Sequence, residues 1–122
     1  MSYSAIASFL MMLAVVLGAF GAHGLKSRLD AYSLGIWEKA VFYHFVHALG
    51  MMIVSVMAQI GMLTAQSAAR VNQLLILGIL LFSGSLYLLA VSGVKTLGAV
   101  TPLGGLSFIA AWLYLTILLA RK

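Results

Sequence analysis

Four long apolar stretches, separated by short segments that carry the charges, make up most of the chain. Each stretch lacks Asp, Glu, Lys and Arg and exceeds the roughly 20 residues that a helix needs to cross the hydrocarbon core of a bilayer. The stretches are residues 1–24, 40–69, 71–94 and 96–120. This pattern predicts an all-α membrane protein, in which a bundle of four transmembrane helices forms one domain over residues 1–122.

Helix signals indicate where the four spans begin and end. Gly24 stands directly after the first apolar run, at the position of a helix stop. Trp37 and Glu38 mark the water boundary of the second span, because Trp is a common anchor at the membrane interface. Thr101 followed by Pro102 is typical of an N-cap and the first helical position. The predicted spans are residues 4–22, 36–61, 73–91 and 101–120.

The segment between the first two spans has a different pattern. Leu25, Leu29, Tyr32 and Ile36 recur at spacings of three to four, while polar residues occupy the other face. We therefore expect a short interfacial amphipathic segment, a helix or a turn that lies on the membrane surface.

Composition supports the membrane assignment and limits the partners. Hydrophobic residues make up 64% of the chain and charged residues 7%, with a mean hydropathy of +1.15. Soluble domains carry about a quarter charged residues. The net charge of +5 is spread over loops and the C-terminus. We therefore expect the lipid bilayer, with its anionic headgroups, as a partner and no nucleic acid.

Basic residues are distributed almost evenly over the two sides of the membrane. Four of them fall in the connections between spans 1 and 2 and spans 3 and 4, and three fall on the other side. This count does not settle the orientation. The basic pair Arg121 and Lys122 directly follows the last span, which favours both termini in the cytoplasm.

Polar motifs of all four spans fall in one leaflet half, because spans 1 and 3 end on the side where spans 2 and 4 begin. We call this half the motif side. It contains the sequences GAFGAHG, WEKAVFYHFVH, FSGSLY and TPLGG. Spanning a bilayer does not require such an asymmetry, so the pattern predicts a polar pocket. The candidate pocket residues are His23, Tyr43, His44, His47, Ser83, Ser85 and Tyr87.

His47 carries the strongest functional signal of this set. Counting about 1.5 Å per residue from Lys39 places it about 12 Å into the core, near the midplane. An ionisable group at that depth indicates a functional site. The simpler interpretation, which we favour, is a neutral His47 that is satisfied by a hydrogen bond from a neighbouring helix, with Ser83, Ser85 or Tyr87 as the expected partner.

The histidines raise two cofactor alternatives. A metal on His23, His44 and His47 would have no carboxylate ligand, because Glu38 is nine residues from His47 and on the opposite helix face. A b-type haem could be held by His23 and His47, but the presence of these two histidines is the only evidence for it. We expect neither cofactor. A pocket for a quinone or lipid, with imidazole and tyrosine as hydrogen-bond partners, agrees better with the composition.

Small residues at regular spacing indicate close helix packing. Ala14, Gly18 and Ala22 form a stripe at intervals of four residues. The glycines predicted to pack against other helices are Gly18, Gly21, Gly84, Gly104 and Gly105.

Four ordered motifs cover nearly the whole chain. They are LGAFGAHGL, YHFVHALG, LFSGSLYLLA and TPLGGLSFIAAW. In order and spacing they resemble the domain-of-unknown-function 423 family, small four-span bacterial membrane proteins with a eukaryotic relative known as transmembrane protein 256. The resemblance implies a protein of the bacterial inner membrane with no established activity. His44 is not a fixed part of the family pattern, whereas His23 and His47 are.

These features favour a non-catalytic accessory or scaffold component, within a larger membrane complex or a homo-oligomer. One alternative is a binder of an amphipathic ligand such as a quinone or lipid. A second is a small transporter or channel, although no acidic residue lies inside a span to couple transport to protons. No Ser, His and acid residues occur at the spacing of a nucleophilic enzyme, so an enzyme is not expected.

Overall fold

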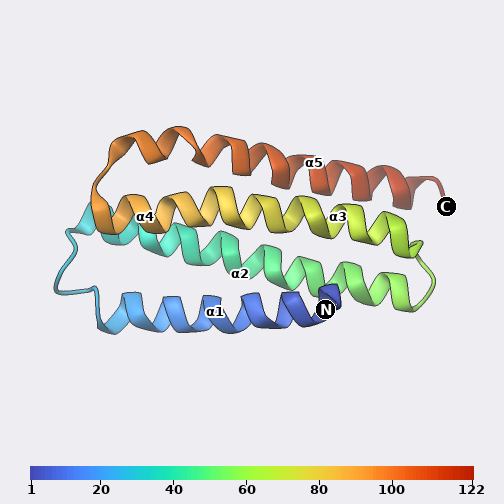
Figure 1. Ribbon diagram of the computed structural model, residues 1–122, viewed down its shortest axis with the longest axis horizontal. Coiled ribbons are helices and arrows are strands. Elements are labelled where there is room, and N and C mark those ends of the chain that lie inside the picture. The colour runs from blue at the N-terminus through green and yellow to red at the C-terminus, as the bar shows by residue number, and fades with distance from the viewer.

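The structure, a computed structural model that describes all 122 residues, consists of long helical segments that lie side by side (Figure 1). The elements are α1 (Tyr3–His23), α2 (Ala31–Gln59), α3 (Ala65–Gly78), η1 (Ile79–Ser83), α4 (Gly84–Ser92), η2 (Lys95–Ala99) and α5 (Thr101–Ala120). Because α3, η1 and α4 are continuous, they form one span, and η2 leads into α5. Four helical segments are long and apolar enough to cross a membrane, which confirms the predicted all-α membrane fold.

The second span begins earlier than predicted. Asp30 caps α2, since its carboxylate accepts a 2.7 Å hydrogen bond from the backbone amide of Ser33. This hydrogen bond also holds the pKa of Asp30 below its usual value. Tyr32 and Ile36 therefore belong to α2, and the expected interfacial segment is a turn over residues 24–30.

The third span also begins earlier, at Ala65 rather than at residue 73. The Thr64 hydroxyl accepts a hydrogen bond from the Ser67 amide and caps the helix. The first turns of α3 look polar in sequence, but Ala68 and Val71 on one face are buried. Because this face packs against the core, the helix includes residues 65–72, which the sequence predicted to be a link between spans.

Two local features of the motif side differ from the expected regular helices. Residues 79–83 form one π-helical turn inside the third span, a widening that often marks functional sites. Thr101 is the first residue of α5 and not its N-cap. Its hydroxyl instead makes a 2.6 Å hydrogen bond with that of Ser85, because α4 and α5 meet there.

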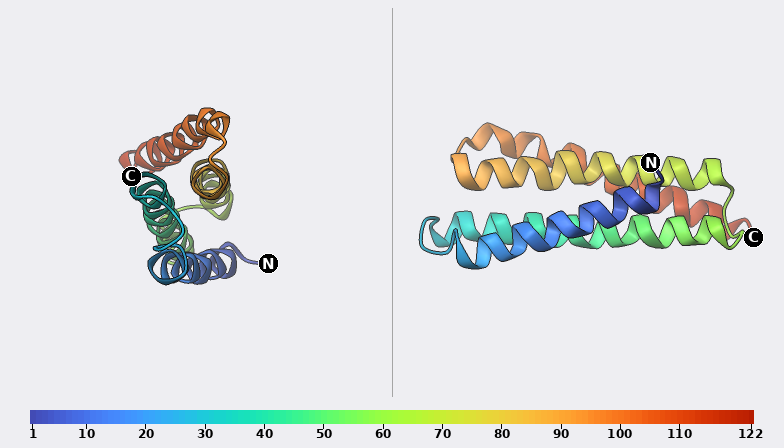
Figure 2. Two further views of the ribbon diagram at one scale, coloured as in Figure 1. Left: turned by 90° about the vertical axis from the view of Figure 1, so that its left-hand side faces the viewer. Right: turned by 60° about the horizontal axis from the view of Figure 1, so that its bottom comes forward.

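The segments pack in chain order rather than around one central axis. α1 packs on α2, α2 on the third span, and the third span on α5. In Figure 1, α1 and α5 lie on opposite sides of the molecule, and the end-on view in Figure 2 agrees. The main core lies between α2, α3 and α5, around Met51, Val71 and Leu75. A smaller cluster at the motif side holds Leu25, Trp37 and Ala90.

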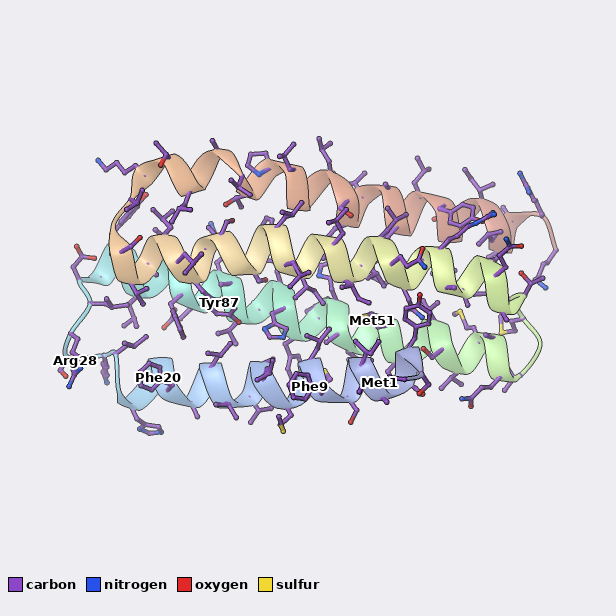
Figure 3. All side chains as sticks on the ribbon, viewed as in Figure 1. Met1, Phe9, Phe20, Arg28, Met51 and Tyr87 are labelled. Atoms are coloured by element: carbon purple, nitrogen blue, oxygen red, sulfur yellow. The ribbon has the colours of Figure 1, made fainter.

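The outer position of α1 leaves one of its faces uncovered. Phe9, Val15 and Phe20 are each more than half exposed. Figure 3 marks Phe9 and Phe20 along this helix. Such apolar surface is suited to contact with lipid tails.

Glycines allow the closest helix contacts. A Cβ at Gly104 would lie 2.2 Å from the backbone nitrogen of Phe82, and one at Gly21 would lie 2.4 Å from the indole nitrogen of Trp37. A Cβ at Gly18 would lie 3.3 Å from Val41. Gly84 and Gly105 have more room, with nearest distances of 4.0 and 3.8 Å. Of the five predicted glycines, Gly21 and Gly104 are thus the closely packed ones, and Gly78, which was not predicted, is as tight, since its Cβ would lie 2.3 Å from the Phe108 ring.

We predict that Gly104→Ala destabilises the protein by about 1–3 kcal/mol, because a methyl group there forces the π-helical backbone away from α5. The free energy of unfolding in mixed micelles measures this. Gly35→Ala is the matched control, since a Cβ there meets nothing within 4 Å. It should leave stability unchanged or raise it by up to about 1 kcal/mol. Equal effects of the two substitutions would contradict the packing role of Gly104.

Candidate functional site

His44 joins α2 to α4 on the motif side. Its Nδ1 lies 2.8 Å from the hydroxyl of Tyr87, and the two residues share a hydrogen bond. The Tyr87 ring packs at 4.7 Å against the indole of Trp37, and Figure 3 shows Tyr87 next to α2. The other nitrogen of His44, Nε2, is buried and unpaired, and the ring lies near the Leu10 carbonyl of α1.

His47 faces a different neighbour, α5. Its ring stacks on Phe108 with the centroids 3.6 Å apart and also packs against Tyr43 and Trp112. Nδ1 donates a 2.7 Å hydrogen bond to the Tyr43 carbonyl. A carbonyl only accepts, so a neutral ring carries its lone pair on Nε2. The structure thus places His47 in an aromatic cluster with α5, whereas Tyr87 pairs with His44 one turn away on α2.

The serines of the third span hold helices together. Ser83 in the π turn is fully buried and donates a 2.8 Å hydrogen bond to the Ala40 carbonyl of α2. Ser85 bonds to Thr101 and to the Phe82 carbonyl. Neither hydroxyl forms a hydrogen bond with a histidine. Both act as structural contacts at this site.

His23 lies away from the other candidates. It is exposed at the end of α1, and Gly21 at the same level packs on Trp37. His47 follows Trp37 by ten residues, about 15 Å along α2. The pair His23 and His47 therefore has no geometry for a shared haem. No group of three His, Asp or Glu side chains is close enough to hold a metal ion.

The seven predicted residues consequently form no single cavity. Two packing clusters, one around His44 and one around His47, fill the space that the sequence assigned to a polar pocket. The cavities that the structure does contain lie on other faces of α2.

One of these cavities is a groove between α1 and α2, which we call the α1–α2 groove. Its volume is about 360 Å³. Its walls are mostly apolar or aromatic, with Glu38 as the one charged side chain. The lining residues are Gly18, Gly21, Ala22, Trp37, Glu38, Val41, Phe42 and Phe45. The sequence signal for it is the stripe of small residues in α1, which by itself predicts only close packing.

The second cavity, of about 390 Å³, lies at the membrane surface between the start of α2, the end of α4 and η2. Asp30, Tyr32 and Lys95 contribute to its lining. It is a polar surface depression rather than a membrane pocket.

Sequence reasoning also missed a buried polar pair in the opposite leaflet half. Asn72 is 1% exposed, and its amide donates a 3.3 Å hydrogen bond to the Ser55 hydroxyl. The Asn72 carbonyl oxygen Oδ1 is buried without a partner. The one sequence signal for this pair is the polar residue Asn72, which stands just before the predicted start of the third span at residue 73.

The family described as "Protein of unknown function (DUF423)" matches residues 17–105. The chain belongs to the DUF423 family. The UPF0382 membrane protein of Staphylococcus haemolyticus is 48% identical over 109 residues, covering 87% of this chain and 84% of the relative. The UPF0382 membrane protein YwdK of Bacillus subtilis is 44% identical over 106 residues, covering 87% and 85%. No solved structure matches the chain.

These similarities confirm the family resemblance seen in the four motifs. This DUF423 protein is thus a membrane protein whose relatives are bacterial membrane proteins of unknown function. Nothing in the comparisons points to a catalytic activity.

We predict that Tyr87→Phe destabilises this DUF423 protein by about 1–2 kcal/mol, because it leaves Nδ1 of His44 without a partner in a buried site. Unfolding in mixed micelles provides the measurement. Tyr32→Phe is the matched control, since Tyr32 is 75% exposed and its hydroxyl makes no hydrogen bond. In the double variant with His44→Phe, the added cost of Tyr87→Phe should largely disappear. An unchanged cost in that background would show that the pair is not coupled.

Proposed function

We propose that this DUF423 protein is a non-catalytic membrane protein that binds an amphipathic small molecule in the α1–α2 groove. The observation that carries the proposal is the groove itself. Its volume of about 360 Å³ falls within the range of small-molecule sites, which are mostly apolar with a few polar groups.

The groove has the orientation that an amphipathic ligand needs. Gly21 packs on Trp37 two residues before α1 ends, so Trp37 and Glu38 lie near the membrane surface. Phe45 follows Trp37 by eight residues, about 12 Å along α2. The groove therefore runs from the interfacial level into the hydrocarbon region. A polar head would lie beside Glu38, and an apolar body would lie along Phe42 and Phe45.

Small residues keep the groove open. Gly18 and Gly21 let Val41 and Trp37 of α2 pack directly against α1, and Ala22 adds only a methyl group, so no large side chain of α1 projects into the groove. On the other wall, Trp37 is fixed because its indole nitrogen donates a 2.9 Å hydrogen bond to the Leu17 carbonyl. A site with one fixed wall needs little reorganisation when a ligand binds.

A scaffold role, in which a helix of another protein or of a second copy occupies the groove, is the competing function. The small residues of α1 would also suit a close helix contact. This possibility predicts a complex without a bound small molecule, so the same experiment distinguishes it.

We place the protein in the bacterial inner membrane with both termini in the cytoplasm. The names of the bacterial relatives support a membrane location, and the basic pair at the end of α5 supports this orientation. The groove would then open at the extracytoplasmic surface.

We predict that protein extracted gently from its own membrane carries a stoichiometric amphipathic molecule, detected by native mass spectrometry. Ala22→Leu should abolish this binding, because the larger side chain fills the groove. Ala19→Leu is the matched control: Ala19 is also exposed on α1 but does not line the groove. An empty wild-type protein, or equal occupancy in both variants, would refute the proposal. A dimer or a protein complex without a ligand would support the scaffold function instead.

A further inference from the structure

Glu38 is the only charged side chain that lines the α1–α2 groove. It is exposed, and its carboxylate makes no hydrogen bond or ion pair within the chain. Asp30, the only other acidic residue of the protein, is the N-cap of α2, eight residues before Glu38, and lines the second cavity instead. The groove therefore has one unneutralised negative charge in a protein whose net charge is +5.

Aromatic rings accompany this carboxylate. Trp37, Phe42 and Phe45 line the same groove, and Phe42 is 64% exposed. The face of an aromatic ring carries partial negative charge and attracts cations, with Trp the strongest partner. Aromatic rings combined with a carboxylate are the usual recognition elements for substituted ammonium groups.

The surroundings of the groove favour a cation over an anion. None of the eight lining residues is basic, and Lys39, the neighbour of Glu38, does not contribute to the lining. A phosphate or carboxylate head would meet the Glu38 charge without a compensating cation. A neutral head would leave this charge unpaired in a site that the ligand partly dehydrates.

We propose that the α1–α2 groove selects amphipathic cations, with a substituted ammonium head at Glu38 and an apolar chain along Phe42 and Phe45. This inference rests on the proposed function and adds the chemical class of the ligand. The depth of the groove agrees with it, because Glu38 lies near the membrane surface, where a charged head remains in contact with water and lipid headgroups.

The test uses the fluorescence of Trp37. The chain contains two tryptophans, Trp37 and Trp112, so Trp112→Phe leaves Trp37 as the only indole. The full-length variant is placed in nanodiscs of phosphatidylglycerol, whose head group carries no ammonium, and titrated with N-dodecylpyridinium, a cationic amphiphile whose ring quenches indole emission. We expect saturable quenching, and we expect dodecyltrimethylammonium to reverse it whereas uncharged dodecanol at equal membrane concentration does not.

Glu38→Gln should weaken binding of N-dodecylpyridinium roughly tenfold, because it removes a charge-assisted contact. Asp30→Asn is the matched control. It removes the same charge, keeps a residue that caps helices well, and leaves the groove unchanged. We expect the affinity of this variant to stay within about twofold of the parent, since a distant exposed charge contributes little.

The outcomes separate the two proposals. If dodecanol displaces the probe as well as the ammonium compound does, and Glu38→Gln binds like the parent, selection of cations is refuted while ligand binding in the groove stands. If quenching is not saturable, or persists in Ala22→Leu, the groove is not a ligand site and both proposals fail. Equal losses in Glu38→Gln and Asp30→Asn would indicate a general surface charge effect and would also refute the role of Glu38.

Discussion

Hydrogen bonds from side chains to backbone carbonyls of the facing helix fix each contact between neighbouring spans. Trp37 of α2 donates to Leu17 of α1, Ser83 of the π turn donates to Ala40 of α2, and Ser107 of α5 donates to Leu74 of α3. In hydrocarbon there is no water to take the place of these partners. Since lipid tails are as apolar as the core, such bonds and close packing must supply the specificity of the helix contacts.

The same constraint explains why the polar residues of the motif side do not form a pocket. A buried polar group without a partner is costly, so His44 pairs with Tyr87 and Ser85 pairs with Thr101. His47 instead uses the carbonyl of Tyr43 in its own helix. These bonds use Nδ1 of both histidines and the hydroxyls of Tyr87 and Ser85, so these groups are not free to bind a ligand in a shared pocket. The open space lies beside α1, where small residues leave the α1–α2 groove.

The packing order also separates stable from exposed parts of the protein. The third span contacts both α2 and α5, whereas α1 packs mainly on α2. Gly104 and Phe82 bring α5 against the π turn, so the structural core is concentrated around the third span. α1 can therefore present a groove without weakening that core, since the groove involves the side of α2 that faces away from α5.

The sequence by itself determined the four spans, the motif side and the family, because length, apolar composition and motif order do not depend on how helices face one another. The sequence predicted the starts of the second and third spans less well. Both segments look polar, but caps at Asp30 and Thr64 and the buried face of α3 make them helical. Only the tertiary structure decided which side chains meet. His44 and His47 differ by roughly 60° around α2, yet one faces Tyr87 and the other Phe108. The rotation of each helix about its axis sets such contacts, and spacing along one helix does not determine that rotation. The same rotation places Glu38 in an aromatic groove rather than simply at the water boundary.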